Sequence, residues 1–240
     1  MKTVLITGAN KSIGFETAGQ LAARGYHVYL GSRDLQKGVD AVARLKAEGA
    51  SNVEAVQLDV SDPVSIEAAR KSVSSLDVLI NNAGINGGFP QSPTSIPIAT
   101  LREVFETNVF GAIGVTVAFM DLLKKSSEPR IVNVTSGLAS LTLHSDPSWQ
   151  YYAIKSAAYG PSKTALNAYT VALAYELRDT PFRINAVDPG YTATDFNQHR
   201  GPGSVESAAA IVVKYALIGA DGPTGRFFSN DREGGGESPW

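Results

Sequence analysis

The feature that most constrains the fold of this chain is a regular alternation of short apolar runs with longer amphipathic segments. Such alternation is typical of βαβ units, in which parallel strands are joined by helical crossovers. We therefore expect an α/β fold, a doubly wound parallel sheet of about seven strands with helices on both faces. The expected strands are Thr3–Thr7, His27–Gly31, Val53–Leu58, Asp77–Asn81, Arg130–Thr135, Arg183–Val187 and a short Arg226–Phe228.

The expected helices lie between these strands, and two of them carry clear end signals. Gly49 is a favourable C-cap, and Asp62-Pro63 combines an N-cap with proline in the first turn. Ile85–Thr100 is rich in Gly, Pro and Ser and is expected to form a loop, whereas Gly137–Ala158 gives no clear pattern. The first expected helix follows the turn after the first strand and ends near Arg24. The others cover Leu35–Glu48, Asp62–Ser74, Leu101–Lys125 (with a break near Gly111–Gly114), Ser162–Arg178 and Val205–Ile218.

Length and composition favour one domain over residues 1–240. The chain has no linker-like segment, and its 43% hydrophobic and 18% charged residues are globular values. A net charge of −2 gives no electrostatic case for nucleic acid or an anionic membrane as a partner, and no uninterrupted apolar run approaches the roughly 20 residues of a membrane span. The chain has no cysteine, which excludes disulfides and thiolate metal sites. A strand beginning at Thr3 argues against a preceding signal peptide, so we expect a cytoplasmic protein.

A small-residue turn from Gly8 to Gly14 follows the first strand. A strand that enters a helix through such a turn directs free backbone N–H groups and the positive end of the helix dipole at one spot, which suits a phosphate. The spacing is G-x-x-x-S-x-G, with Ser12 at a position where a second glycine is usual. Taken alone, the turn is equally consistent with a tight strand-to-helix connection.

Ser12 leaves two conformations open. If its φ is positive, serine costs roughly 1 kcal/mol there; if it is negative, the N–H or hydroxyl of Ser12 faces the phosphates. We expect the second, because Asn10 and Gly14 can form the sharp bend.

Small or polar residues follow every expected strand, and parallel strands bring their carboxyl ends to one crevice. The candidate cofactor-binding residues are Gly8, Asn10, Lys11, Ser12, Ile13, Gly14, Arg33, Asp59, Val60, Asn82, Ala83, Gly84, Tyr159, Lys163, Pro189, Gly190, Thr192 and Thr194. Sites that prefer NAD usually carry an acidic residue after the second strand, but here the residue is Arg33. Arg33 can pair with a 2′-phosphate, and Lys11 adds a second positive charge, so we expect NADP(H) in preference to NAD(H).

Tyr159 and Lys163 lie four residues apart, so on a helix both side chains project from one face. A free tyrosine has a pKa of about 10, and a nearby ammonium moves this pKa toward neutral pH. Ser136 follows the fifth strand and can hydrogen-bond a substrate oxygen, and Asn108 can hold a water that returns the proton. We expect Asn108, Ser136, Tyr159 and Lys163 to be catalytic.

Taken together, these residues resemble the short-chain dehydrogenase/reductase family across nearly the full chain. The motifs are Thr7-Gly8-x-x-x-Ser12-x-Gly14, Asp59-Val60, Asn81-Asn82-Ala83-Gly84, Asn108, Ser136, Tyr159-x-x-x-Lys163 and Pro189-Gly190. The resemblance implies a Rossmann-type fold, a tyrosine general acid, a lysine that lowers its pKa and holds the nicotinamide ribose, a serine that orients the carbonyl, and an asparagine in a proton relay. The ending from Gly222 to Phe228, with Trp240 last, resembles the carbonyl-reductase branch.

The 23 positions from Ser136 to Tyr159 exceed the spacing usual in this family, which implies an insertion within Gly137–Ala158. The insertion contains a second Tyr-x-x-x-Lys, Tyr151 to Lys155. We assign the catalytic pair to Tyr159 and Lys163, because the residues after Lys163 continue the pattern of the family.

Segments 85–98, 137–158 and 191–204 are expected to form the substrate pocket, with Phe89, Trp149, Tyr191 and Phe196 as its aromatic walls. The expected function is reduction of a ketone or aldehyde of moderate size and apolar character by hydride transfer from NADPH. An alcohol dehydrogenase working oxidatively and a non-catalytic dinucleotide sensor are the alternatives. His27, His144 and His199 are scattered and suggest no metal site. The sequence leaves a monomer and a homo-oligomer both open.

Overall fold

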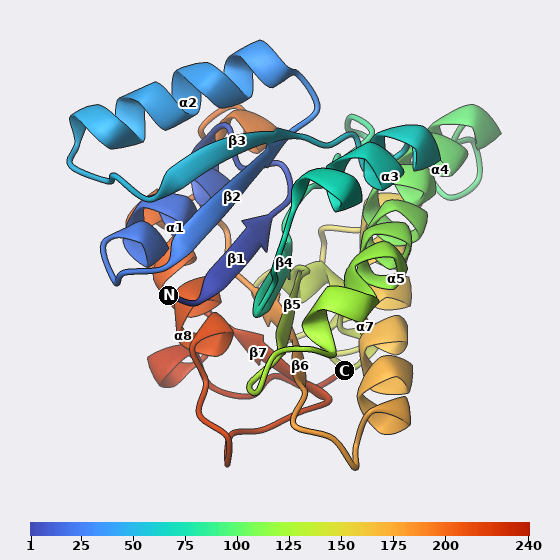
Figure 1. Ribbon diagram of the computed structural model, residues 1–240. Coiled ribbons are helices and arrows are strands. Elements are labelled where there is room, and N and C mark those ends of the chain that lie inside the picture. The colour runs from blue at the N-terminus through green and yellow to red at the C-terminus, as the bar shows by residue number, and fades with distance from the viewer.

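The computed structural model describes residues 1–240 and contains one seven-stranded sheet. Its order is β3-β2-β1-β4-β5-β6-β7, and all pairs are parallel. Figure 1 shows this doubly wound sheet between two layers of helices. The predicted fold class is confirmed. The strands are β1 (Thr3–Ile6), β2 (His27–Ser32), β3 (Val53–Gln57), β4 (Val78–Asn81), β5 (Arg130–Val134), β6 (Arg183–Asp188) and β7 (Arg226–Ser229).

The strands are apolar on both faces because helices cover both. Val4 and Ile6 of β1 belong to one core, which α1 (Ser12–Ala22), α2 (Leu35–Ala47) and α8 (Val205–Ala216) cover. Leu5, between them, belongs to the other core. The alternation follows from strand geometry, in which successive side chains point to opposite faces.

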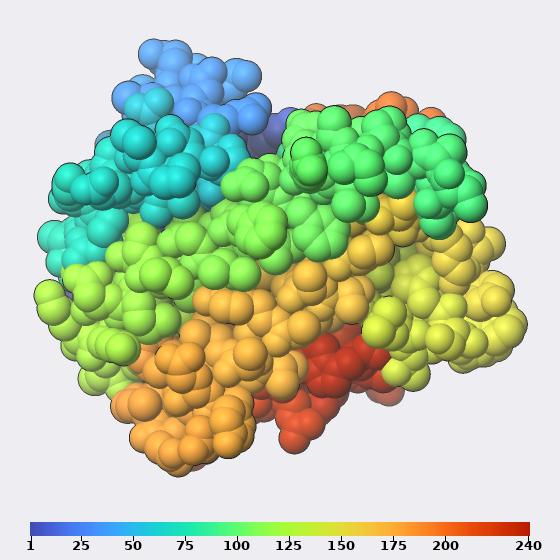
Figure 2. Space-filling model, turned by 90° about the vertical axis from the view of Figure 1, so that its right-hand side faces the viewer, coloured from blue at the N-terminus to red at the C-terminus, as the bar shows by residue number.

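The second core lies under α3 (Pro63–Ser72), α5 (Ala112–Leu123) and α7 (Tyr159–Glu176). α3 begins as predicted, with the Asp62 carboxylate accepting the Val64 N–H at 2.9 Å. Figure 2 shows the face formed by α3, α5 and α7, with the yellow segment around residue 150 as a bulge at its edge.

Three predictions about helix bounds and continuity are wrong. α7 begins at Tyr159, not at Ser162, because the distant Gln91 and the nearby Ser156 accept N–H groups of its first turn. The helix predicted from Leu101 begins at Ile98. The predicted break near Gly111–Gly114 is a π-helical segment, Glu106–Gly111, and it joins α4 (Ile98–Phe105) to α5 without interruption.

The resulting helix, Ile98–Leu123, is long and apolar enough to cross a bilayer by length and composition alone. Half of its most apolar window is buried inside the protein. Burial of that extent is typical of the core helix of a folded domain.

The expected backbone conformation of Ser12 is wrong. Ser12 has a φ of +51° and Gly8 a φ of +62°, so both residues lie in the left-handed region. The bend therefore needs two left-handed residues. Gly14 does not share this role, since its φ is not in the left-handed region.

This conformation gives a first prediction. Replacing Ser12 with glycine should raise the free energy of unfolding by about 0.5–1 kcal/mol, because glycine adopts positive φ without a Cβ penalty. The lost hydrogen bond from Ser12 Oγ to Asp195 is long, at 3.3 Å, and exposed. Urea denaturation of Ser12→Gly measures the change. Ser51→Gly is the control, since Ser51 lies outside the left-handed region and should gain no stability. Equal or lower stability of Ser12→Gly would contradict the argument.

Candidate active site

The first turn of α7 places Tyr159 and Lys163 on one side of the helix, next to the end of β5. Lys163 Nζ lies 6.0 Å from the centre of the Tyr159 ring and donates a hydrogen bond to the Val134 carbonyl at 2.9 Å. Lys163 is buried, and no carboxylate pairs with it. An ammonium and a phenol are thus held at the carboxyl end of the central strands.

Ser136 completes this group from the loop after β5. Its hydroxyl interacts with the Tyr159 phenol and also accepts the Leu138 N–H at 3.2 Å, which caps the short 3₁₀ helix Gly137–Ala139. The cap fixes the position of the serine oxygen beside the phenol.

Burial dominates the protonation of both groups. It raises the pKa of Tyr159 above its ordinary value; the Ser136 hydroxyl offsets part of the rise, and the Asp188 carboxylate adds to it. Burial also lowers the pKa of Lys163 to about 8. The expected lowering of the Tyr159 pKa by Lys163 is therefore not met in this arrangement. Loss of hydration outweighs an ammonium that is 6.0 Å from the ring centre and bonded to a backbone carbonyl.

Asn108 lies in the π-helical segment, and its side chain spans the gap to the loop after β4. Its Oδ1 accepts the Ile85 N–H at 2.8 Å, and its Nδ2 donates to the Ile85 carbonyl at 2.9 Å and to Ser162 Oγ at 3.0 Å. Ser162 in turn donates to the Tyr159 carbonyl at 2.7 Å. The wider π turn thus brings Asn108 to the helix that carries Tyr159.

The loop after β4 packs against the turn after β1 and forms hydrogen bonds with it. Asn82 Nδ2 donates to the carbonyls of Thr7 at 2.9 Å and Gly8 at 3.1 Å. A Cβ on Gly14 would lie 2.6 Å from the same nitrogen, so only glycine fits there. Asn82 therefore shapes the turn with its side chain, and Ala83 lies directly beneath Gly8, since a Cβ there would be 3.0 Å from Ala83 Cα.

Lys11 and Ser12 face a carboxylate in this structure. Asp195, from the loop after β6, lies 3.5 Å from Lys11 Nζ and accepts a hydrogen bond from Ser12 Oγ at 3.3 Å. The hydroxyl of Ser12 is thus bonded to Asp195. Asn10 has no side-chain hydrogen bond, and Ile13 is partly buried.

Arg33 lies directly after β2, exposed, with no ion pair or hydrogen bond to its guanidinium. The Asp59 carboxylate accepts hydrogen bonds from the Ser61 N–H at 3.0 Å and the Ser61 hydroxyl, so it stabilises its own turn. Val60 is buried against Gly111, where a Cβ would lie 2.8 Å from the Val60 carbonyl.

The loop after β6 supplies the remaining expected residues. Gly190, which follows Pro189, turns with a φ of +79°, and its N–H is bound by the buried Asp188 carboxylate at 3.0 Å. Burial raises the pKa of Asp188 to about 6. Thr192 and Thr194 are buried, and Thr192 Oγ1 donates back to the Gly190 carbonyl at 3.2 Å.

The second tyrosine–lysine pair does not come together. Lys155 donates to the His144 carbonyl at 2.8 Å and lies over the Tyr152 ring, whereas Tyr151 packs edge-on against Trp149 and Tyr191. Only Tyr159 and Lys163 share a helix face beside Ser136.

The expected aromatic walls are only partly assembled. Phe196 packs on Tyr159 with ring centres 5.4 Å apart, and Trp149 and Tyr191 join through Tyr151. Phe89 is 53% exposed and makes no aromatic contact. Sequence reasoning missed Ser162, Asp195 and Gln91, each of which acts through a contact with a distant segment, and no local pattern marks such contacts.

Comparison with known proteins places this geometry in a family. Residues 2–204 match the family model described as short chain dehydrogenase. The chain is 34% identical to (+)-neomenthol dehydrogenase of Capsicum annuum, over 93% of this chain and 94% of that protein. Salutaridine reductase from Papaver somniferum has a similar structure, with a TM-score of 0.82 and 30% identity over 96% of this chain and all of the other. An NADPH-bound carbonyl reductase from chicken fatty liver gives a TM-score of 0.84 at 25% identity, over 100% and 99% of the two chains.

The buried ammonium gives a second prediction. Lys163→Met should raise the free energy of unfolding at pH 7 by about 1–2 kcal/mol, because removing a charge that burial disfavours outweighs the cost of leaving the Val134 carbonyl unbonded. The pKa of Lys163 is about 8 in the folded protein and 10.5 in the unfolded chain, so both states bind the proton below pH 8 and the full cost of burying the charge is present there. As pH rises from 8 to 10.5 the folded protein loses the proton first, and the difference between the two proteins should shrink. Urea denaturation at pH 7 and pH 9.5 measures both, and a less stable variant at pH 7 would contradict the prediction.

Proposed function

The chain belongs to the short-chain dehydrogenase family, and from this premise we propose that it reduces ketone or aldehyde carbonyls with NADP(H), with Tyr159 as the general acid. The observation that carries the proposal is the group formed by Tyr159, Ser136 and Lys163 at the carboxyl ends of the central strands. Proteins similar to this chain are oxidoreductases of the reductase type that act on carbonyl and alcohol substrates.

The turn after β1 fits a dinucleotide phosphate. Gly8 is left-handed, Gly14 has no room for a Cβ, and the amide of Asn10 is free to donate. Backbone N–H groups at the start of α1 then point toward the crevice. A bound NADPH would supply the hydride. The Asp195 carboxylate pairs with Lys11 and accepts a hydrogen bond from the Ser12 hydroxyl, so a cofactor phosphate would compete with this carboxylate for both side chains.

Arg33 supports the phosphorylated cofactor, because its exposed guanidinium is unpaired and follows the second strand. A guanidinium binds a phosphate bidentately, and no carboxylate occupies this position to bind a free ribose. We therefore propose NADP(H) in preference to NAD(H).

The proton transfer follows from the contacts of Tyr159. As negative charge develops on the carbonyl oxygen, the phenol donates its proton and the Ser136 hydroxyl orients the oxygen. The ammonium of Lys163 stabilises the phenolate that results. Ser162 and Asn108 connect the Tyr159 carbonyl to the loop after β4 and keep this turn of α7 in place, and we propose that Asn108 also takes part in returning the proton.

We propose that segments 85–98, 137–158 and 191–204 enclose the substrate, within a single catalytic domain. Their aromatic residues, with Phe196 against Tyr159, favour an apolar carbonyl compound of moderate size. The same residues catalyse the reverse reaction, and similar proteins carry both dehydrogenase and reductase names, so oxidation of an alcohol is the second candidate.

The general acid gives a third prediction. Tyr159→Phe should lower kcat for carbonyl reduction by about 10²–10⁴-fold, because the substrate oxygen loses its proton donor. Tyr151→Phe is the matched control and should keep wild-type kcat, since Tyr151 packs against Trp149 and Tyr191. Initial rates of NADPH oxidation with a panel of ketones and aldehydes measure both. Loss of activity in Tyr151→Phe with retention in Tyr159→Phe would reverse the assignment.

The cofactor preference gives a fourth prediction. Arg33→Ala should lower kcat/KM for NADPH by about 10–100-fold and change kcat/KM for NADH little, because a charge-assisted hydrogen bond contributes about 1.5–3 kcal/mol. Arg24→Ala is the control, since Arg24 bonds the Gln20 carbonyl at the far end of α1. A higher kcat/KM of the wild-type enzyme for NADH than for NADPH would contradict the proposed preference for NADP(H).

A further inference from the structure

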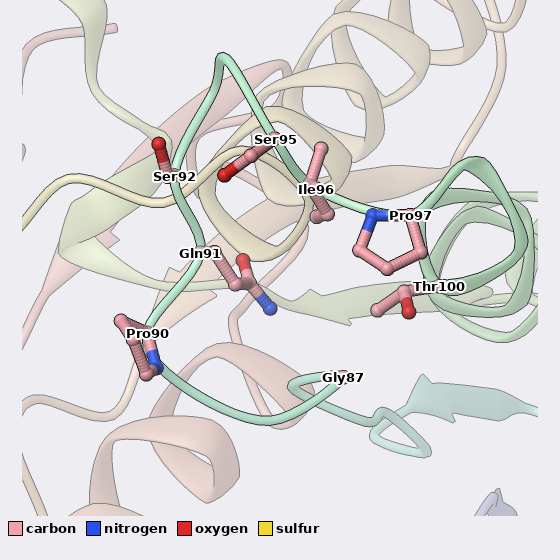
Figure 3. A pocket seen from close by; sticks show the side chains of 8 residues that line it. All are labelled: Gly87, Pro90, Gln91, Ser92, Ser95, Ile96, Pro97 and Thr100. Carbon is pink, nitrogen blue, oxygen red and sulfur yellow. The ribbon is translucent and has the colours of Figure 1, made fainter.

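Gln91 is a buried amide in an otherwise exposed loop. Its side chain lies in segment 85–98 and the residue is only 5% exposed. Figure 3 shows this side chain pointing across the loop that runs from Gly87 to Thr100, in the opposite direction from Ser92. Gln91 also lines a small cavity of about 190 Å³. A loop glutamine is usually solvated, so its burial needs a physical reason.

The reason is the N-terminus of α7. Gln91 Oε1 accepts the N–H groups of both Ala158 and Tyr159, each at 3.1 Å. Ala158 is the N-cap residue of α7 and has no side-chain oxygen to do this. A helix leaves its first N–H groups without partners, and the side chain that normally accepts one of them comes from the N-cap itself. Here the cap is supplied by a loop far away in the sequence.

The other end of the amide holds the substrate loop. Gln91 Nε2 donates to the carbonyls of Gly88, at 2.8 Å, and Asn86. Asn86 Nδ2 donates in turn to the Phe196 carbonyl at 2.7 Å, and the Phe196 ring packs on Tyr159. Three hydrogen bonds thus connect the Tyr159 backbone through Gln91 and Asn86 to Phe196, and the ring of Phe196 contacts the Tyr159 ring.

We propose that Gln91 is a positioning residue that fixes the Tyr159 phenol relative to the two loops enclosing the substrate. The inference rests on the proposed function, since it assumes that Tyr159 is the proton donor. Tyr159 is the first residue of α7, so its backbone is held by Gln91 and not by a preceding helical turn. The Gln91 side chain forms no hydrogen bond with the phenol or with Ser136, and it acts through the backbone and the loop.

The experiment separates the two ends of the amide. Gln91→Met keeps the length of the side chain and removes both functions. Gln91→Glu keeps an acceptor at the helix N-terminus, where a carboxylate is favourable, but cannot donate to Gly88 and Asn86. Asp62→Ala is the control for loss of a cap in general, because Asp62 caps α3 outside the site. Steady-state kinetics with NADPH, urea denaturation and hydrogen exchange of the segment 158–163 are measured on all four proteins.

We expect Gln91→Met to lower kcat by about ten-fold or more, because small displacements of reacting groups have large effects on rate. The KM for NADPH should not change. Gln91→Glu should recover most of kcat but keep a raised KM for the carbonyl substrate, since the loop is no longer held. Hydrogen exchange of residues 158–163 should be faster in Gln91→Met alone. Asp62→Ala should lose stability and keep wild-type kinetics.

Three outcomes would overturn the proposal. One is that Gln91→Met and Asp62→Ala lose similar stability while both keep wild-type kcat, which is the result of a purely structural cap. Another is that Gln91→Glu is no more active than Gln91→Met. If Gln91→Met does not fold, a folded but inactive Gln91→Glu would overturn the proposal by itself. The third is unchanged exchange of residues 158–163 in Gln91→Met. Failure of the proposed function is distinct, since it shows as a wild-type protein without NADPH-dependent turnover, whatever the exchange result.

Discussion

The site depends on keeping one ammonium buried without a counter-ion. Lys163 lies in the second turn of α7, and the only hydrogen bond of its ammonium is to the Val134 carbonyl at the end of β5. A buried charge of this kind costs stability unless fixed dipoles surround it. The carbonyl end of β5, the Asn108 amide oxygen and the Gly84 backbone all lie close by, and a Cβ on Gly84 would be 3.2 Å from Asn108 Oδ1 and 3.4 Å from Lys163 Nζ. The glycine after β4 thus leaves the space that the ammonium occupies.

A buried polar network holds the helices around this charge. Asn81 Nδ2 on β4 donates to Thr116 Oγ1 at 3.0 Å and to Asn133 Oδ1 on β5 at 2.8 Å. Asn133 Nδ2 donates to Thr170 Oγ1 on α7 at 2.8 Å. Because each of these groups is buried, a shift of α5 or α7 along the sheet would leave polar atoms unbonded, at about 1–3 kcal/mol each. The network therefore limits sliding of α7 and keeps Lys163 in register with Val134.

The fold was predictable from the sequence because its signals are local, whereas much of the detail in the site is not local. Apolar runs and the cap at Asp62 lie within or beside the elements that they define. The start of α7 was predicted three residues late because its cap, Gln91, is far away in the sequence. The conformation of Ser12 was predicted wrongly because a turn sequence does not show which residues take positive φ. The contact of Asp195 with Lys11 joins opposite ends of the chain, and no periodicity indicates it.

The two Tyr-x-x-x-Lys pairs of the chain lie in different surroundings, and residues 137–158 hold the first of them. Residues 137–158 contain the 3₁₀ helix Gly137–Ala139 and the short helix α6 (Leu141–His144), and the Thr142 N–H is bound by the Trp240 carbonyl at 3.0 Å. His144 bonds the Leu138 carbonyl at 3.1 Å and receives Lys155, while burial and Lys155 both lower the pKa of this imidazole. Lys155 is therefore engaged within the insertion and exposed, where water screens its charge from Tyr151. Lys163 is also bonded to a backbone carbonyl, that of Val134, but it is buried, because the helix and the sheet exclude water around it. The same four-residue spacing thus gives an exposed surface lysine in one segment and a buried ammonium beside a phenol in the other, and burial is what separates them.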